Sequence, residues 1–381
     1  MVSRAEAAAQ AAGNPLSFLH VVRSDIDLPP ETDPHDPRVY AKARENLQYL
    51  MSEGFLVQEF APGVFVYELT SGRRRQTGVV GCVHVDDYAR NLIRKHETTR
   101  RDKEDDRTQH ILTLEAHAEP VLLAHEASPF LAQLCKSVKD GDPLLECSAD
   151  EVEHRVWRVE KPASFVDAVR RIPHAYIADG HHRCAGAWRA AQELRAKRGP
   201  DAADEADWFL AVLFPANRLR IQGYHRVVRD LNGMTPDGFI ARLGEIGSVS
   251  ATDTPLPQSA GQFGVYVDGR WYRFSLKAEE PEPLDPARSL DAALLQARVL
   301  EPVLAIGDVR TDARIGFVGG GRGVPELERL VNSGEMAAAF ALRPVTMQQL
   351  MQVSDAGGIM PPKSTWFEPK LRSGLFVHSL R

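Results

Sequence analysis

The sequence predicts an α+β fold of the mixed α/β kind, because segments that favour β-strands alternate with segments that favour helices. Three observations carry this prediction. A β-rich hairpin pattern occupies residues 64–85, the run at 208–214 is almost wholly apolar, and a strand-turn-helix pattern spans 175–197. The length of 381 residues is sufficient for two domains. We expect them at residues 1–200 and 201–381, divided in the polar loop that follows the strand-turn-helix pattern.

Strand and helix signals follow one another along the first domain. The alanine-rich start favours a helix that Gly13 and Pro15 end, and Ser128 before Pro129 is typical of a helix start. Proline and aspartate make residues 27–37 a loop. In order, we expect a helix at 3–12, a strand at 16–22, a helix at 38–53, paired strands at 64–69 and 76–85, a strand at 119–125, a helix from 129 to about 135, an edge or half-buried strand at 153–159 and a helix at 164–171.

The next segment is a strand that turns sharply into a helix. Residues 175–178 form a short apolar run that fits a buried strand, and Asp179-Gly180 is a turn signal. The helix that follows carries an apolar stripe that would dock on a sheet, formed by Cys184, Ala187, Trp188, Ala191 and Leu194. We expect the first turn of this helix to face solvent.

The second domain repeats the alternation. The run at 208–214 reads as a central strand buried on both faces, and Asp268-Gly269 is the two-residue turn of a hairpin. Further along we expect a strand ending near 230, a capped helix at 235–246, the hairpin at 263–274, helices at 290–304 and 326–331, a strand at 337–342, a helix at 347–356 and a last strand at 373–380. The glycine run at 319–323 is best read as a flexible turn, because it lacks the spacing of a phosphate-binding loop.

Composition and charge exclude several classes of protein. The shares of 43% hydrophobic and 26% charged residues are ordinary for a globular protein, and the net charge of −6 argues against broad nucleic-acid binding. No stretch reaches the roughly 20 apolar residues of a membrane helix, and the N-terminus lacks the apolar segment of a secretion signal. We expect a cytoplasmic protein without a membrane or nucleic-acid partner, whose four cysteines are reduced thiols: Cys82, Cys135, Cys147 and Cys184.

The helix start at Gly180 is a candidate anion site. His181, His182 and Arg183 lie in its first turn, where backbone N–H groups lack partners and carry a partial positive charge. Such a place binds phosphate, since Gly180 allows close approach and Arg183 can hold two phosphate oxygens. Two plainer interpretations stay open: the His-His-Arg turn is an ordinary surface or core turn, and Asp179 is only an N-cap.

This motif, Asp179-Gly180-His181-His182-Arg183 followed by Ala185, resembles the nucleotide-binding signature of the ParB/sulfiredoxin-like superfamily. With both histidines it is most similar to the free-serine-kinase branch. Over nearly its whole length the chain resembles the domain-of-unknown-function 1015 family, in segments at 14–20, 95–97, 103–107, 178–183 and 360–367. The resemblance implies a ParB/sulfiredoxin-like nucleotide-binding domain at 1–200 with N-terminal additions, and an appended C-terminal α+β domain at 201–381. It also implies that a family segment containing Pro-Pro-Tyr-Asp, ahead of the first helix, is missing here.

A second stretch with chemistry runs from residue 92 to 107 and mixes charges of both signs. Asp102 is a candidate N-cap for a helix running to about residue 117, and a charged helix start is usually a solvated face. The resemblance adds a function, because in the serine-kinase branch a His-Glu pair precedes the motif and its glutamate is the general base. His96 and Glu97 match that pair. The resemblance therefore implies that Glu97 takes a proton from a substrate hydroxyl.

The tail at 360–370 combines two prolines with Lys363, Ser364 and Thr365, a cation and two hydroxyls in a row. Without a preceding glycine loop this is not a Walker motif, and it can equally be a structural lid. The resemblance favours a tail that closes over a phosphate.

The leading hypothesis is a phosphotransferase that uses ATP or ADP with Mg²⁺ on a small hydroxylated metabolite, for which the resemblance suggests free L-serine. The motif residues hold the nucleotide phosphates, Arg100 and Arg107 orient phosphate or a substrate carboxylate together with His96, and Lys363 neutralises the transferred group. We assign no metal ligands to the chain, and a homo-oligomer stays open.

Two alternatives are kept. The first is a ParB-like nucleotide-binding switch protein that transfers no phosphate to a metabolite. The second is metal hydrolysis by His181, His182 and Glu97, which ranks last because adjacent histidines in a helix point about 100° apart.

Overall fold

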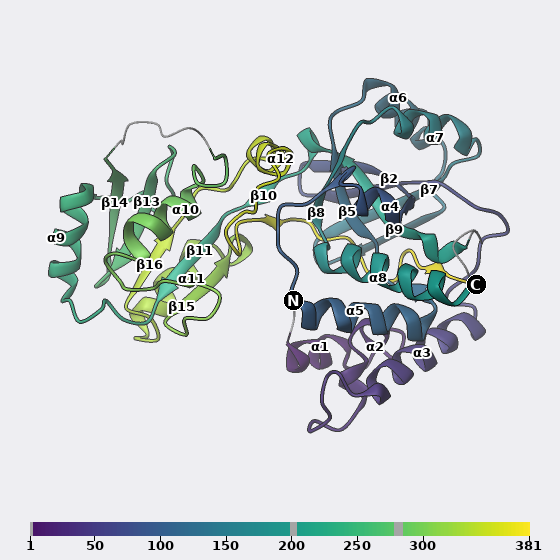
Figure 1. The fold of residues 1–381 in the computed structure, drawn as a ribbon, viewed down its shortest axis with the longest axis horizontal. Helices are drawn as coiled ribbons and strands as arrows, with labels where there is room; N and C mark the ends of the chain where they lie inside the picture. The colour runs from purple at the N-terminus through teal and green to yellow at the C-terminus, as the bar shows by residue number, and fades with distance from the viewer. Residues whose placement is uncertain (1–2, 199–203, 278–284) are drawn as a thin grey trace. The chain divides into compact units, whose positions relative to one another are not determined.

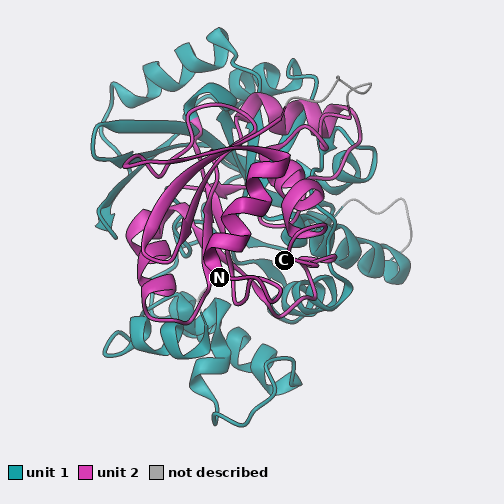
Figure 2. Cartoon of the chain, turned by 90° about the vertical axis from the view of Figure 1, so that its left-hand side faces the viewer, with its two compact units in different colours: residues 1–218, 369–381 teal, residues 219–368 magenta. Residues whose placement is uncertain are grey.

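The computed structural model of the chain describes residues 3–198, 204–277 and 285–381. Helices and strands are mixed along it, which confirms the predicted α+β class (Figure 1). The chain divides into two compact units, coloured teal and magenta in Figure 2: Met1–Arg218 with Pro369–Arg381 (unit 1), and Leu219–Glu368 (unit 2). The break that we expected between residues 200 and 201 lies outside the described residues.

Unit 1 is built on a mixed sheet. Eight strands of the described residues pair in the order β3 (Ile93–Arg94), β8 (Ala175–Asp179), β5 (Val121–His125), β9 (Trp208–Pro215), β2 (Arg74–His84), β1 (Phe65–Ser71), β7 (Val152–Arg158) and β6 (Leu145–Ala149). β9 lies between the parallel β5 and the antiparallel β2, and its side chains from Phe209 to Phe214 are all buried, as predicted for a central strand. β7 is half-buried as expected, but it is not an edge, because β6 pairs beyond it.

The helices of unit 1 are close to the predicted positions. Ser3 forms a capping box at the first helix, and Ser128 caps the helix that opens with Pro129. The described α-helices of this unit are α1 (Arg4–Ala11), α2 (Leu19–Val22), α3 (Pro37–Ser52), α4 (Val85–Ala89), α5 (Arg101–Leu114), α6 (Pro129–Lys139), α7 (Pro162–Arg170) and α8 (His181–Arg198). Short 3₁₀ turns are η1 (Ser24–Asp27), η2 (Glu205–Asp207) and η3 (Ala216–Arg218).

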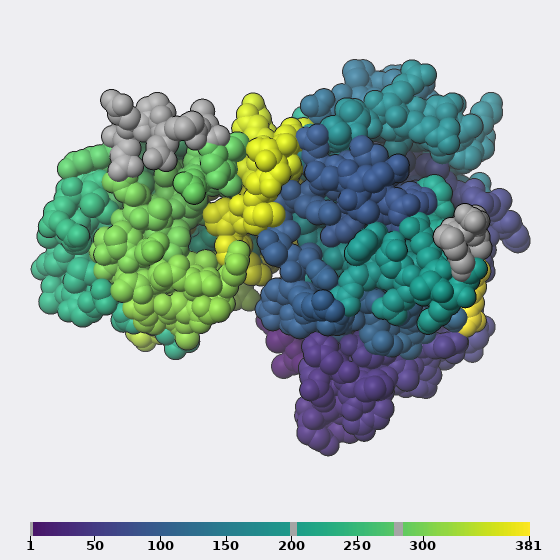
Figure 3. Space-filling view, in the orientation of Figure 1, coloured from purple at the N-terminus to yellow at the C-terminus, as the bar shows by residue number. Residues whose placement is uncertain are grey.

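The predicted strand at 16–22 is wrong, since this segment contains the short helix α2. Its Val21 is fully buried in a cluster with Leu47 of α3 and Leu114 of α5. This packing outweighs the β preference of the valines. Together, α1 to α3 form a helical layer of unit 1 (Figure 1), and residues of this N-terminal part are purple on the surface in Figure 3.

α8 docks on the sheet through the predicted stripe. Cys184, Ala187 and Ala191 pack in one cluster with Leu123 of β5 and Phe209 of β9. The helix therefore holds its N-terminal turn in a fixed place beside the end of β8.

The segment after residue 368 returns to unit 1. The ring of Phe376 lies 5.6 Å from the rings of both Phe65 and Tyr67. Within the predicted strand at 373–380, only β18 (His378–Ser379) is a strand, and it pairs with β4 (Ala116–His117). The strand prediction was too long because ring packing, not a continuous ladder, holds residue 376.

Unit 2 contains an antiparallel six-stranded sheet in the order β12 (Gly247–Ala251), β14 (Arg270–Leu276), β13 (Gln262–Val267), β16 (Ala338–Ala341), β11 (Tyr224–Val228) and β15 (Ile315–Gly319). Asp268 and Gly269 form the predicted hairpin turn, both with positive φ. Alternate residues of β13 face opposite sides, so Phe263 packs with α9 (Pro236–Ile246) and α10 (Asp291–Leu295), whereas Tyr266 packs with α11 (Gly323–Asn332).

The remaining elements of unit 2 are α9 (Pro236–Ile246), α10 (Asp291–Leu295), a π-helical turn (Gln296–Leu300), the 3₁₀ turn η5 (Gly320–Arg322), α11 (Gly323–Asn332), α12 (Met347–Asp355) and the pair β10 (Ile221–Gln222) with β17 (Trp366–Phe367). The expected single helix at 290–304 is thus an α-helix that widens into a π turn. Among the described residues of both units, none of the helices combines the length and the apolar character that crossing a lipid bilayer requires.

Candidate functional site

The candidate site lies where two parallel strands end. Because β3 pairs in parallel with β8, the segments that follow them leave the sheet at the same edge. His96 and Glu97 follow β3, and Gly180 and His181 follow β8. This topology brings together two segments that are far apart in the sequence.

Gly180 makes the turn from β8 into α8. Its φ of 108° is one that residues with a side chain rarely adopt. A Cβ atom at this position would lie 2.9 Å from Nε of Arg183. Glycine is therefore needed for the backbone turn and for the place of the Arg183 side chain.

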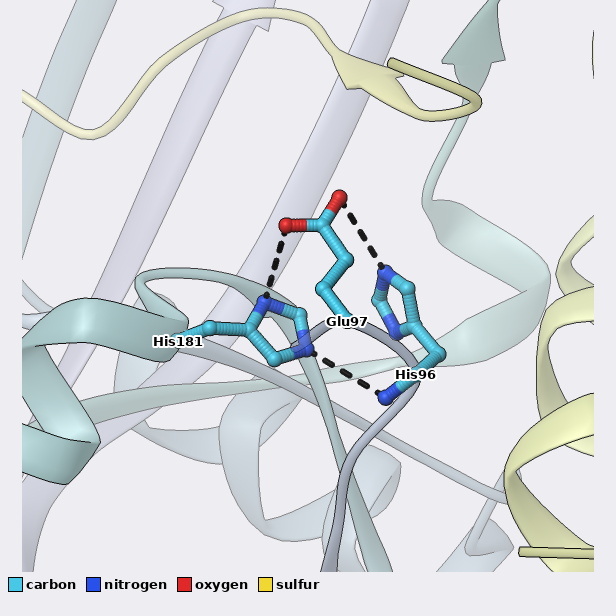
Figure 4. Close-up of side chains that lie close together, drawn as sticks. All are labelled: His96, Glu97 and His181. Atoms are coloured by element: carbon cyan, nitrogen blue, oxygen red, sulfur yellow. Dashed lines mark hydrogen bonds and ion pairs between the residues drawn. The ribbon is translucent and has the colours of Figure 1, made fainter. Parts of the chain in front are cut away.

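His96, Glu97 and His181 form a compact group of side chains (Figure 4). Nδ1 of His181 lies 3.6 Å from Oε2 of Glu97, and Nε2 of His96 lies 4.0 Å from Oε1 of the same carboxylate. The two imidazole rings meet edge to face with their centroids 4.4 Å apart. The predicted solvent-facing first turn of α8 is therefore wrong at His181, which is 5% exposed because the ring of His96 covers it.

The hydrogen bonds assign the tautomer of His181. Its Nε2 accepts the backbone N–H of His96 at 3.4 Å. A neutral imidazole that accepts at one nitrogen carries its proton on the other. The Nδ1–H of His181 therefore points toward the Glu97 carboxylate.

Both imidazoles are neutral at pH 7. Burial lowers the pKa of His96 to about 3, and burial together with His96, His182 and Lys95 lowers the pKa of His181 well below its usual value. His96 is fully buried, and within the described residues neither of its ring nitrogens has a hydrogen-bond partner. Unsatisfied polar atoms of this kind are rare in folded proteins and often mark functional positions.

The three side chains also have the spacing of a metal site, since one ligand atom of each lies within 4.8 Å of the others. Two imidazoles and one carboxylate suit a transition-metal ion better than Mg²⁺. However, a histidine that binds metal through one nitrogen donates the N–H of the other, whereas Nε2 of His181 accepts. The hydrogen bonds therefore favour a carboxylate held by histidine over a metal centre.

His182 fixes the backbone at the start of α5. Its Nε2 accepts the N–H of Arg100 at 3.1 Å, so this ring contacts protein where we predicted phosphate. Arg100 is itself the N-cap residue, and its guanidinium pairs with Asp102 at 2.7 Å. The prediction that Asp102 caps the helix is wrong, because α5 begins at Arg101 and Asp102 lies inside its first turn.

Arg183 and Asp179 form a small network with Lys370, which belongs to the C-terminal segment of unit 1, Pro369–Arg381. Nη1 of Arg183 donates to the carbonyl of Pro120 at 2.6 Å, and Nη2 lies 3.8 Å from the Asp179 carboxylate. Lys370 lies 3.0 Å from the other oxygen of Asp179. Loss of water contact raises the pKa of Asp179, but the two cations outweigh it and hold this pKa below the usual value. Asp179 thus pairs with cations at the end of β8.

Arg107 lines the same small cavity of unit 1 as Arg183. Its guanidinium pairs with Asp106 at 2.7 Å, and Nη1 lies 3.9 Å from Glu119. Arg107, Glu119 and Arg183 line one small cavity of unit 1 together with the buried His110. The structure therefore brings two of the predicted guanidinium groups to one cavity, each with a protein partner in place.

Lys363, Ser364 and Thr365 belong to unit 2. Lys363 and Ser364 line a cavity of that unit, and the Ser364 hydroxyl donates to the carbonyl of Pro361 at 2.6 Å. Their predicted closure over the phosphate of the first motif stays a prediction.

Sequence reasoning missed two contacts of the site. Lys370 pairs with Asp179 across 191 positions, and the Pro120 carbonyl binds Arg183. A lone lysine and a proline carbonyl carry no recognisable pattern, so only the fold could identify them. The hydrogen bond that His181 accepts from the backbone N–H of His96 was also missed, because that N–H belongs to a segment 85 positions away.

The fold and the site define an α+β protein in which a carboxylate faces the N-terminus of a helix. The chain belongs to the family described as "Protein of unknown function (DUF1015)", whose sequence pattern matches residues 1–293. None of the curated proteins compared with the chain matches it.

Solved structures resemble the chain weakly. A conserved hypothetical protein from Pyrococcus furiosus shares 14% identity at a TM-score of 0.34, covering 84% of this chain and 96% of its own. Free serine kinase in complex with AMP shares 14% identity at a TM-score of 0.38, with coverages of 76% and 86%. SbnI with a C-terminal truncation, from Staphylococcus aureus, shares 11% identity at a TM-score of 0.39, with coverages of 77% and 85%. Similarities this weak carry no argument about the site or its chemistry.

Proposed function

We propose that this protein is a nucleotide-dependent phosphotransferase, using ATP or ADP, that acts on a small hydroxylated metabolite. The observation that carries the proposal is the position of the Glu97 carboxylate, 3.6 Å from the first residue of α8. The start of a helix binds phosphate through its free N–H groups, so a base and an anion site lie side by side. The resemblance of the motif at 179–183 to the ParB/sulfiredoxin-like signature supports a nucleotide as the anion.

Four residues of the chain would each have a role in the proposed phosphoryl transfer. Glu97 takes the proton of the acceptor hydroxyl as that oxygen bonds to the terminal phosphorus and the bond from phosphorus to the bridging oxygen breaks. The Nδ1–H of His181 orients the Glu97 carboxylate, and the N–H of His96 fixes the tautomer of His181. Arg183 binds phosphate oxygens by exchanging the Pro120 carbonyl for them. The bound nucleotide supplies the phosphoryl group.

Mg²⁺ enters this proposal only as the partner of the nucleotide phosphates. Mg²⁺ is usually held by one or two carboxylates plus phosphate oxygens and water. The group of two imidazoles and Glu97 does not match that donor set. We therefore assign no magnesium ligand to the chain and derive no step through the ion.

The test is a transfer assay. Full-length protein with ATP or ADP, Mg²⁺ and a panel of small hydroxylated metabolites that begins with L-serine should yield a phosphorylated small molecule. Glu97→Gln removes the base, so we expect turnover to fall by roughly 10²- to 10⁴-fold while nucleotide affinity is retained. Glu193→Gln, on the exposed side of α8, is the matched control and should behave as the parent protein. Equal loss in both variants, or nucleotide binding without product for the whole panel, would contradict the proposal.

One observation favours the alternative, a nucleotide-gated switch. Arg183 and Asp179 already have protein partners, and one of them, Lys370, lies in the C-terminal segment. A nucleotide that bound Arg183 would break its contacts with Pro120 and Asp179. It would thereby change the pairing of Asp179 with Lys370 in the C-terminal segment. Nucleotide binding that alters protease cleavage near residue 370, without any phosphorylated product, would favour the switch.

A further inference from the structure

Contacts with buried residues of unit 2 fix the proline-rich loop at residues 360–364. Arg226 is 3% exposed, and its guanidinium donates to the carbonyls of Pro362 at 3.1 Å and Tyr224 at 2.8 Å. It also lies 4.7 Å from the centroid of the Phe317 ring. A buried cation requires such partners to offset its loss of water. The Ser364 hydroxyl also donates a hydrogen bond to the Pro361 carbonyl. Together these contacts fix the backbone conformation on both sides of residue 363.

Lys363, between these fixed neighbours, has a φ of 56° in the left-handed region. Residues with a Cβ stay in this conformation only where the surroundings hold them, and such positions cluster at functional sites. The ammonium group lies 5.7 Å from the centroid of the Tyr224 ring. Among the described residues, no carboxylate lies within ion-pair distance of it. The strained backbone thus presents a cation that lacks a counter-ion.

A second cation faces the same cavity. Arg343 lines it with Lys363, Asp291 and Gln349, and the other walls are largely apolar. Nε of Arg343 lies 3.6 Å from Asp291, and within the described residues it has no hydrogen-bond partner. Asp291 is buried and also accepts the N–H of Gly261 at 2.8 Å. The cavity lining thus contains two cations and one carboxylate, and that carboxylate pairs with Arg343, which leaves an excess positive charge at the cavity.

We propose that this cavity is a binding site for a small oxyanion, the phosphate or carboxylate group of a small metabolite, held by Lys363 and Arg343. A guanidinium offers paired N–H donors to such a group, and an ammonium adds a point charge. The cavity has room for about one water molecule, so the anionic group binds at its mouth and the rest of the ligand stays outside. This site is separate from the phosphotransfer proposed at Glu97 and does not depend on it.

The experiment is a calorimetric titration of the full-length protein without nucleotide, with inorganic phosphate in one arm and acetate in the other. We expect one or both anions to bind, and Lys363→Met to weaken that binding by about tenfold or more, as expected for a lost charge-assisted contact of about 1.4 kcal/mol. Lys277→Met is the control, because Lys277 is an exposed lysine of unit 2 outside the cavity. Tighter binding of phosphate would identify a phosphorylated ligand, and tighter binding of acetate a carboxylate.

Arg183→Gln separates this site from the first motif, since it should leave the Lys363-dependent binding unchanged. Absence of binding by both anions, or equal weakening by Lys277→Met, would overturn the inference. The inference would also be overturned if Lys363→Met weakened nucleotide binding and left the oxyanion titration unchanged. Lys363 would then contribute to nucleotide binding at the motif of residues 179–183. Failure of the transfer assay at Glu97 would leave this result unaffected.

Discussion

His181 is the residue whose role depends most on its surroundings. It lies in the motif that we expected to bind phosphate, yet its proton is directed at Glu97 by the backbone N–H of His96. The neighbouring His182 is engaged with the backbone of Arg100. The two adjacent histidines therefore hold two positions, His96 and Arg100, of the one loop between β3 and α5. Within the motif, the backbone groups of the turn and Arg183 are left to meet an anion.

His181→Phe tests this assignment, because it keeps a ring against His96 and removes the Nδ1–H that faces Glu97. We expect kcat to fall roughly 10- to 100-fold, the usual effect of losing an orienting partner, with little change in nucleotide affinity. The pH profile of kcat should shift as well, since the base would lose its hydrogen-bond donor. His35→Phe, at an exposed histidine, is the control. A loss of nucleotide affinity with unchanged kcat would instead make His181 a phosphate ligand.

α5 and α8 form the pair of helices that frames the site. Gly186 of α8 lies so close to α5 that a Cβ there would be 2.8 Å from Cβ of Arg107 and 3.2 Å from the backbone N of Thr108. The backbone atom cannot move without moving the helix. The approach of the two helices therefore depends on the absence of a side chain at this position.

Gly186→Ala should destabilise the protein by about 1–3 kcal/mol through overpacking, although alanine favours helices more than glycine does. Gly244→Ala in α9 is the matched control, because nothing lies within 4 Å of a Cβ at that position. There we expect a gain of about 0.4–1 kcal/mol. Urea titrations of both variants and of the parent protein give the free energies of unfolding that test these two expectations. Equal stabilisation by both substitutions would show that the two helices separate easily.

Local signals predicted the elements well where one residue pattern determines them. The caps at Ser128 and Thr235, the turn at Asp268 and the apolar β9 needed no information from elsewhere. Within the predicted strand at 16–22, Leu19–Val22 forms a helix because the partners of Val21 lie in α3 and α5, which a local pattern cannot reveal.

For the candidate site too, local patterns identified single residues but not the contacts between distant ones. Sequence and resemblance singled out Glu97 and the glycine turn, and the parallel pairing of β3 with β8 brings them together. The sequence did not reveal that Arg183 and Asp179 already have partners in distant segments. Contacts between distant residues depend on the topology, so they could not be read from spacing.

The pH dependence of stability is a property of the chain as a whole. Burial lowers the pKa of His110 to about 4 and that of His117 to about 3, below the usual value of about 6.5 in an unfolded chain. Between these values the unfolded state binds protons that the folded state does not, so stability is full above pH 6.5 and falls as the pH is lowered toward 4. Each such histidine contributes at most about 1.4 kcal/mol per pH unit.

His110→Gln keeps a donor for the Val21 carbonyl and removes one titrating group. In urea titrations between pH 4 and 6.5, its stability should fall less steeply with pH than that of the parent, by up to about 1.4 kcal/mol per unit. Identical slopes for the two proteins would mean that His110 is protonated in the folded state.

A crystal structure of the protein with a non-hydrolysable ATP analogue and Mg²⁺ would decide whether the site works as proposed. We expect the phosphates within hydrogen-bond distance of the backbone N–H groups of residues 181–183, with the terminal phosphate facing Glu97. Phosphates bound away from the start of α8, or a Glu97 carboxylate turned away from them, would contradict the account.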